Sequence, residues 1–425
     1  MTGTAAGVGD ASAGPENGSP RTSERTWVLT VSGTHALIHA TELTFAALLL
    51  RIEDDFDSDL LLLGILANVG AFTFGFGALP AGYLVDRLGT VPILRIALGT
   101  TAISGALVGL APDEITLGIF LALLGLTTGL YHPAGITLLA RTRRRARNVG
   151  LHGATGNFGI ALAPALAAGL AVTIDWRAAY FVLAALAGLG FLWTLRLDPR
   201  GAEEGVVPGP VRPRDAEPAS DPSPPRSAAP RGPLLLVYSG FVISGFIYRG
   251  ALTFIPAHIE EEVSIGLFGW EAAAAAGALS TLALLGGAFG WYAGGVASER
   301  WRPEYFVLAM APPTALLLLA MGFASDLGLL IAIVFFAIIN FTMQPAFVTL
   351  VADYSPSGRL GVSYGISFFL SFGLGSFAAT FAGFFADRWG TDSVFLMLAA
   401  VSLLGTLSAF ALVVRVRRNA RAGLI

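Results

Sequence analysis

Residues 132–140 read HPAGITLLA and residues 344–352 read QPAFVTLVA, which gives five identical positions at an offset of 212. Three further short matches occur in the same order at offsets between 209 and 214. They pair Leu43–Phe45 with Leu252–Phe254, Gly82 to Arg87 with Gly295 to Arg300, and Gly169 and Phe181 with Gly383 and Phe395. Four matches in one order at a nearly constant offset predict an internal duplication.

The composition of the chain is that of a membrane protein. Hydrophobic residues make up 54% of it and charged residues 13%, whereas a soluble globular chain carries about 25% charged residues. The mean hydropathy is +0.69. Its 425 residues leave room for about twelve spans of roughly 20 residues each. The net charge of -3 gives no reason to expect a nucleic-acid partner.

Two residue types are absent, and their absence narrows the chemistry. The chain has no cysteine, which excludes disulfides and thiolate catalysis. All 26 basic residues are arginine, so the chain has no P-loop lysine and no Schiff-base lysine. We therefore expect no cofactor, and we expect any flux through the chain to be driven by a gradient.

Apolar run lengths predict an all-α integral membrane protein with twelve transmembrane helices in two pseudo-symmetric six-helix halves. The spans are predicted near 27–50, 60–84, 92–111, 115–140, 149–174, 178–196, 233–257, 268–297, 305–323, 327–352, 363–386 and 393–414. The halves are residues 27–196 and 233–414. They are joined by a Pro-rich linker at 197–232 that has too little apolar surface to fold. Residues 1–26 lack signal-peptide features and are predicted to be a disordered tail, and 415–425 form a second tail.

Charged loop residues predict the orientation. Arginines cluster in both tails, in the linker and after spans two, four, eight and ten, most densely in RTRRRAR at 141–147. The opposite loops carry few arginines and several acidic residues, namely Arg51, Arg177, Arg388 and the acidic runs at 53–55 and 260–262. By the positive-inside rule, both termini and the linker are cytoplasmic in a multi-pass protein of the cell membrane. We interpret RTRRRAR as a topology determinant rather than a lipid-binding site.

The first span contains THALIHATE at residues 34–42, which places three ionisable groups inside an apolar run. His35, His39 and Glu42 are spaced i, i+4, i+7 and therefore share one face of a helix. A charge facing lipid at the bilayer centre costs roughly 2.5 to 3.5 kcal/mol on insertion scales. We therefore predict that this stripe faces protein or water.

The loop after the second span reads GYLVDRLG at residues 82–89. Together with twelve spans and a central linker, this stretch resembles the signature G-x-x-x-D-R/K-x-G-R-R/K of the major facilitator superfamily. The resemblance covers residues 27–414. It departs from the pattern after the second glycine, where Thr90-Val91-Pro92 replaces the usual basic residues.

The resemblance implies a cytoplasmic gate that latches the two halves in one state and releases them in the other. The residues that match the signature and its second-half copy are Gly82, Asp86, Arg87, Gly89, Gly295, Glu299 and Arg300. The second-half copy lacks the glycine that follows the basic residue in the signature, so fewer of the signature residues are present there to form the gate.

Within the superfamily, two stretches resemble fosmidomycin-resistance-type exporters. They are GLTTGLYHPAGITLLAR in span four and GATGNFGIALAPALAAG in span five. The second also approximates the antiporter motif of drug:proton exchangers, with three glycines replaced by alanine. The corresponding positions are Gly150, Gly159, Ala163, Pro164, Ala167 and Ala168. The resemblance implies export.

Spans one, four, seven and ten line the central cavity in this superfamily, and most of the polar intramembrane residues fall on them. Besides the span-one stripe, the cavity candidates are Tyr131, His132, Asn157, Tyr248, Arg249, Asn340 and Gln344. Asn68 is a milder outlier. His132 is either a helix-packing group before a proline or a substrate contact, with Gln344 as its second-half counterpart.

The repeat offset of 209 aligns Arg249 with Ala40. Arg249 is therefore expected within one helical turn of Glu42 in depth in the membrane. The two could form a permanent ion pair, or a pair that opens when Glu42 takes a proton or Arg249 takes an anionic substrate. A third arrangement pairs Glu42 with His39. His35, His39 and Glu42 could also ligate a divalent cation, but Arg249 would repel it, so we predict no metal site.

These observations predict a proton-coupled secondary transporter that exports a small organic solute, organic anions included. Glu42, with His35 and His39, is the predicted proton site, and Arg249 recognises substrate charge or balances Glu42. The alternatives are an uptake symporter or uniporter for an organic anion, and a non-transporting sensor on this scaffold. No nucleophile and base arrangement indicates an enzyme. One chain contains both halves of the pathway, so we expect a functional monomer in the lipid bilayer.

Overall fold

The structure is a computed structural model that describes residues 22–58, 60–200, 231–264 and 272–422. It confirms the predicted all-α fold: the described residues form helices and connecting turns. The first half contains α1 (Glu24–Phe56), α2 (Leu60–Leu88), α3 (Thr90–Gly109), α4 (Glu114–Gly129), α5 (Tyr131–Ala140), α6 (Arg145–Thr173) and α7 (Trp176–Leu195). The second contains α9 (Arg231–Glu262), α10 (Ala272–Ser298), α11 (Pro303–Met321), α12 (Asp326–Thr342), α13 (Gln344–Tyr354), α14 (Leu360–Phe368), the π-helix η1 (Phe369–Leu374), α15 (Phe377–Trp389) and α16 (Thr391–Arg421).

The predicted tails and linker lie only partly within the described residues. Most of the N-terminal tail and of the linker lies outside them. The first seven residues of the predicted C-terminal tail, 415–421, instead continue α16 as helix. The last span therefore extends past its apolar run into an arginine-rich end.

Ten helical segments of the described residues are long and apolar enough to cross a membrane. α1 is not among them, because His35, His39 and Glu42 lower the hydropathy of its central turns. α1 nevertheless lies inside the bundle, packed against α6 and α7. The polar stripe is thus placed in a helix that protein neighbours surround, as the sequence predicted.

Spans four and ten, predicted as single helices, are each broken at one residue. Leu130 separates α4 from α5, and Met343 separates α12 from α13. The cause is Pro133 in the first case and Pro345 in the second, because a proline cannot donate to the carbonyl four residues earlier. The breaks fall in the two stretches that match in sequence, which supports the predicted duplication.

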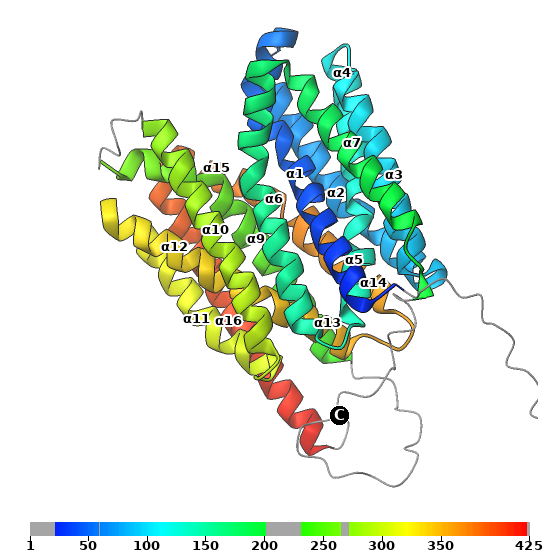
Figure 1. The fold of residues 1–425 in the computed structure, drawn as a ribbon. Helices are drawn as coiled ribbons and strands as arrows, with labels where there is room; N and C mark the ends of the chain where they lie inside the picture. The colour runs from blue at the N-terminus through cyan, green and yellow to red at the C-terminus, as the bar shows by residue number, and fades with distance from the viewer. Residues whose placement is uncertain (1–21, 59, 201–230, 265–271, 423–425) are drawn as a thin grey trace, which may run out of the picture.

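The two halves meet along two seams. In one seam, α2 packs against α14 and η1, and in the other α6 packs against α10. We call the ends of the bundle that carry Glu24, Leu195 and Arg421 the terminal face, and the opposite ends, near Phe56 and Glu262, the distal face. Figure 1 shows the two bundles converging toward the terminal face and diverging toward the distal face.

Candidate functional site

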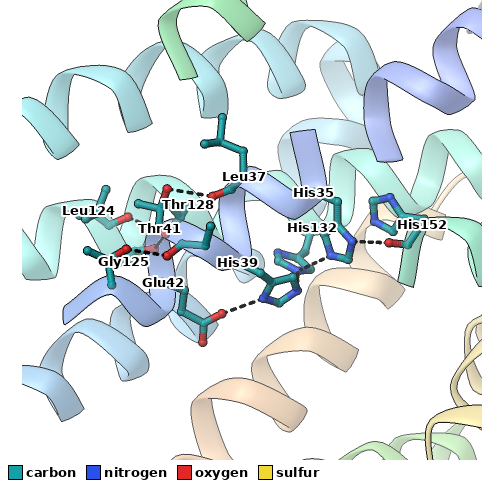
Figure 2. A network of polar contacts seen from close by, with 12 residues as sticks. His35, Leu37, His39, Thr41, Glu42, Leu124, Gly125, Thr128, His132 and His152 are labelled. Atoms are coloured by element: carbon teal, nitrogen blue, oxygen red, sulfur yellow. Dashed lines mark hydrogen bonds and ion pairs between the residues drawn. The ribbon is translucent and has the colours of Figure 1, made fainter. Parts of the chain in front are cut away.

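Four of the five histidines of the chain gather in one buried cluster (Figure 2). His35 and His39 come from α1, His132 from the first turn of α5, and His152 from α6. The rings of His35 and His152 stack with centroids 3.6 Å apart and an interplanar angle of 6°. The chain therefore places four imidazoles from three helices where the sequence predicted two on one helix and one on another.

A series of close polar contacts runs through this cluster. The Nδ1–H of His35 donates to the carbonyl oxygen of His152 at 2.7 Å. The Nε2 atom of His132 lies 3.2 Å from Nε2 of His35 and 3.3 Å from Nε2 of His39. At the end of the series, Nδ1 of His39 lies 2.9 Å from Oε2 of Glu42. The cluster is thus connected by hydrogen-bonding contacts to one carboxylate.

The three converging Nε2 atoms are short of protons. His35 and His39 each use Nδ1–H on an oxygen, so their neutral rings offer only a lone pair at Nε2. His132 can supply a single Nε2–H between them, and its own Nδ1 is then a buried acceptor with no partner among the described residues. Only one of the two Nε2···Nε2 contacts of His132, with His35 or with His39, can then contain a proton, and two lone pairs face each other in the other. An added proton would lie in that second contact. With these tautomers, the neutral cluster has one N–H for the two contacts between the three Nε2 atoms.

The neighbouring backbone is shaped to admit these rings. A Cβ atom added at Gly156 of α6 would lie 2.5 Å from Cε1 of His35 and 3.0 Å from Cδ2 of His39. Only glycine leaves room for both rings at this position. Tyr131 anchors α5 to α1, because its hydroxyl contacts Thr34 at 2.7 Å and also donates to the carbonyl oxygen of Val31.

Glu42 reaches from the cluster into a small cavity between the halves. The lining comprises Glu42, Ala71, Tyr248, Arg249, Ser371, Phe372, Gly375 and Ser376. Its volume is about 10 Å³, which is room for roughly one water molecule. The cavity therefore holds the predicted proton site and the predicted charge-recognition residue in a closed form.

Glu42 and Arg249 line this cavity together but do not form an ion pair at the 4.0 Å limit. Glu42 takes its contact from His39, three residues earlier on the same helix. Among the described residues, the Arg249 guanidinium has no hydrogen-bond or ion-pair partner. An arginine at membrane depth without an ion-pair partner is costly, so the role of Arg249 in anion recognition stays a prediction.

Phe372 of η1 contacts both parts of the site. It lines the cavity, and its ring centroid lies 5.6 Å from that of His132 and 6.4 Å from that of His39. Tyr248 meets the same ring edge-on at 6.4 Å. The cluster and the Arg249 cavity therefore share an aromatic wall.

Asp86, the central residue of the predicted gate, bonds to the other half at the terminal face. Asp86 accepts hydrogen bonds from the backbone N–H groups of Gly361 at 2.7 Å and Val362 at 2.8 Å. These groups belong to the first turn of α14, where a carboxylate also benefits from the helix dipole. Gly82 permits the approach, since a Cβ atom there would lie 2.3 Å from the Gly361 carbonyl oxygen. Arg87 instead stacks over Tyr83 at 4.4 Å.

The second-half copy of the gate is built differently. Glu299 and Arg300 are exposed, and neither makes a side-chain contact across the halves within the described residues. Gly295 packs against Gly150, where an added Cβ atom would lie 2.9 Å from the Cα atom of Gly295. Beside this seam, Arg145 of α6 forms an ion pair of 2.7 Å with Asp353 of α13.

The family model of the Major Facilitator Superfamily matches residues 32–380 and, in a second match, 272–424. The chain belongs to the major facilitator superfamily. Its closed terminal face and its central cavity with Glu42 and Arg249 are accordingly features of a membrane transporter of this superfamily.

One protein with a similar sequence and two solved structures with a similar fold agree with this membership. An uncharacterized transporter of Bacillus subtilis, YybO, is 26% identical over 135 residues, which cover 31% of this chain and 31% of that protein. The Escherichia coli fucose:proton symporter FucP shares the fold with a TM-score of 0.68 at 16% identity, over 92% of this chain and 99% of that one. The proton:xylose symporter XylE gives a TM-score of 0.74 at 13% identity, over 91% and 95%. At these identities the solved structures show the fold alone.

The other predicted cavity residues of this superfamily member lie away from Arg249. Asn157 of α6 lies against α10 at Gly287. Gln344 donates to the hydroxyl of Ser244 at 2.7 Å, and Asn340 is buried in α12. None of the three lines the cavity around Glu42.

The sequence interpretation missed His152 and the Arg145–Asp353 pair. His152 stands on span five, outside the four spans that the resemblance assigns to the cavity. Gly156, four residues after His152 and on the same face of α6, was the available signal. A residue without a side chain there leaves room for the rings of α1 to approach this face. From the sequence, Arg145 is only one residue of the RTRRRAR segment that predicts the membrane orientation.

A three-histidine set also appears where the sequence predicted no metal. One nitrogen each of His35, His39 and His132 can be chosen so that all lie within 4.8 Å of one another. Glu42, which the sequence considered as a third ligand, instead contacts Nδ1 of His39. Arg249 lines the cavity with Glu42, next to the cluster, and its positive charge opposes a cation nearby. The absence of a metal site stays a prediction.

Proposed function

We propose that the chain is a proton-coupled secondary transporter that exports a small organic solute by alternating access, with both termini in the cytoplasm. One observation carries the proposal. A buried, proton-deficient histidine cluster ends at a carboxylate, Glu42, and that carboxylate shares a cavity with an unpaired arginine. In this proposal Glu42, His35 and His39 hold the transported proton, and Arg249 binds an anionic group of the solute.

The titratable and charged groups around Glu42 come from four helices, α1, α5, α6 and α9. His39 lies beside it on α1, with His35, His132 and His152 behind, and Tyr248 and Arg249 face it from α9. Protonation of Glu42 would leave Arg249 as the net charge of the cavity and so strengthen its hold on an anion. Loss of the proton would weaken that hold. Proton and anion affinities are thereby positively linked, which is the coupling of a symporter. Export driven by an inward proton gradient needs a solute whose binding displaces the proton from Glu42.

The direction of transport rests on the resemblance to fosmidomycin-resistance-type and drug:proton exporters. The runner-up is an uptake symporter or uniporter for an organic anion that uses the same cavity. A sensor without transport is disfavoured, because Asp86 and Arg145 form latches between the halves that a static receptor would not need.

The test uses proteoliposomes that contain a trapped pH dye. Gradients of organic anions, phosphonates and amphipathic drugs are imposed in turn, with and without a metal chelator. We expect a solute-dependent change of internal pH that the chelator does not affect. The sign of the change separates antiport from symport.

Matched variants separate the cluster from general damage. His39→Gln should reduce the proton signal, whereas His258→Gln should leave it unchanged. His258 is also buried, but it contacts Thr391 and the carbonyl oxygen of Met321 at the distal end of the second half. If labelled solute equilibrates without proton movement, the chain is a facilitator. Loss of transport on chelation would favour a metal in the cluster.

A further inference from the structure

The charges of the cavity specify the solute further, given the proposed function. Glu42 and Arg249 line one cavity and are not paired with each other. Within the described part of the chain, Glu42 accepts a contact only at Oε2, so Oε1 is available. A solute with one positive and one negative group would neutralise both side chains at once. We propose that the substrates are small zwitterions, with an ammonium group at Glu42 and an acidic group at Arg249.

The walls of the cavity suit both ends of such a solute. Tyr248 and Phe372 line it with rings at an interplanar angle of 85°, and aromatic faces attract ammonium groups. Ser371 and Ser376 also line it. The Ser376 hydroxyl already donates to the carbonyl oxygen of Gly373, so Ser371 is the hydroxyl that can donate to the acidic group. Each end of a zwitterion thus meets a charge and a neutral partner.

Solute charge then determines the sign of proton coupling. A neutral complex is favoured at membrane depth because unbalanced charge is costly there. A monoanion on Arg249 reaches neutrality when Glu42 is protonated, so solute and proton bind together. A zwitterion reaches it when Glu42 is ionised, so when Glu42 holds the transported proton in the empty site, the ammonium group displaces that proton. Zwitterions therefore give antiport, and monoanions give symport.

Proton exchange on binding tests this inference. Taurine and ethanesulfonate differ only by the ammonium group, and their longer homologues cover larger spacings. Binding to the purified chain is measured by calorimetry in buffers of different ionisation enthalpy. We expect the aminosulfonates to release protons and the alkylsulfonates to take them up. Glu42→Gln should abolish both exchanges and weaken aminosulfonate binding about tenfold, whereas the exposed control Glu260→Gln should change neither.

The outcomes distinguish the two proposals. Proton uptake with both series would overturn the zwitterion class and leave proton-coupled anion transport intact. Binding without proton exchange in either series would overturn the coupling itself. Failure of every aminosulfonate to bind would also overturn the zwitterion class.

A second inference comes from a different part of the chain, where the gate signature occurs again at the distal face. Residues 82–89 read GYLVDRLG and residues 383–390 read GFFADRWG. The local structures agree as well. Arg87 stacks over Tyr83 at 4.4 Å, and Arg388 stacks over Phe384 at 3.9 Å.

The turns after the two copies also match. Gly89 has φ 91° and ψ 169°, and Gly390 has φ 82° and ψ 167°. Each glycine directly precedes the next helix, α3 or α16. Because L residues rarely adopt this backbone conformation, the second copy is a structural repeat and not only a chance string.

The copies lie at opposite ends of one antiparallel helix pair. In the seam between α2 and the α14–η1 segment, the residue numbers of opposed positions add up to between 443 and 448, as for Gly82 with Gly361 and Gly75 with Gly373. Extended along the pair, this register places Asp387 level with residues 56 to 61, where α2 begins. Asp86 occupies the corresponding place at the start of α14.

We infer that Asp387 is the latch of the distal gate. Asp86 holds the terminal face closed through backbone N–H groups of α14. Asp387 is exposed and unpartnered among the described residues, in a conformation whose bundles diverge at that face (Figure 1). When the distal face closes, Asp387 caps the first turn of α2 in the same way. One helix pair thereby carries a latch for each state.

Spin-label distances across the distal face test this latch. The chain has no cysteine, so labels can be placed at the exposed positions Asp54 and Phe323. In an Asp86→Asn background, which favours closure of the distal face, Asp387→Asn should lower the closed population about fivefold or more. Asp392→Asn, a carboxylate five residues away, is the control. An unchanged distance distribution in Asp387→Asn would overturn the inference.

Discussion

The two halves of the chain share a topology and differ in where they place charge. At matching positions of the repeat, the first half has His132 and the second has Gln344. The first half contributes the histidine cluster and Glu42, and the second contributes the unpaired Arg249. The gates differ in the same manner, because Asp86 caps α14 whereas its counterpart Glu299 caps no helix in the described ranges. This difference supports the proposal that the first half carries the proton through Glu42 and that the second half supplies the cation that binds the acidic group of the solute.

The largest effect is expected from Arg249→Gln, which removes the cation of the second half. Loss of one partner of a buried, charge-assisted contact costs about 2 to 5 kcal/mol, so solute kcat/KM should fall about 30-fold or more. Transport kinetics in proteoliposomes measure this. Arg51→Gln, at an exposed position near the distal face, should stay near wild type. Comparable losses in both variants would remove the division of labour between the halves.

A smaller effect is expected from Asp86→Asn, which tests the asymmetry of the gates. Asn keeps the shape but loses the charge and one acceptor, at a cost of about 1 to 2 kcal/mol. The population with an open terminal face should rise about 5- to 30-fold. Spin labels at the exposed positions Arg143 and Ser357 report it. Glu299→Gln should cause no shift, and an equal shift would contradict the asymmetry.

The smallest effect is expected from Arg145→Gln in the second seam. Arg145 and Asp353 are partly exposed, with side-chain accessibilities of 21% and 24%. Such pairs contribute about 0.5 to 1 kcal/mol, so the same distance measurement should show a two- to fivefold shift. The double variant Arg145→Asp with Asp353→Arg should restore the wild-type distribution. Failure of the swap to restore it would assign the seam to the Gly150–Gly295 packing alone.

Much of the architecture could be predicted because apolar runs, prolines and the repeat are local signals. The twelve spans and the inward placement of the His35, His39 and Glu42 stripe follow from periodicity and charge. The helix breaks before Pro133 and Pro345 were also readable from the absence of a proline N–H, although the spans were predicted as continuous.

The partners within the site could not be predicted, because they depend on distances between helices. The sequence predicted that Glu42 and Arg249 lie at a similar depth in the membrane, and both line one cavity. The contact of the Glu42 carboxylate is nevertheless with His39, one turn earlier on α1. His152 joins the cluster only because α6 approaches α1 closely at Gly156. The sequence offered the His39–Glu42 contact as one alternative, because the two residues are three apart on one helix, but it could not choose between that contact and the pair with Arg249.

The central claim is that the first half carries the proton through Glu42 and the second binds the solute. Solute counterflow and proton-driven accumulation, measured in the same proteoliposomes with Glu42→Gln, test it most directly. Wild type should sustain a solute ratio that changes about tenfold per pH unit for one coupled proton. The variant should retain counterflow while this ratio falls to one. Proton-driven accumulation that survives in Glu42→Gln would contradict the account.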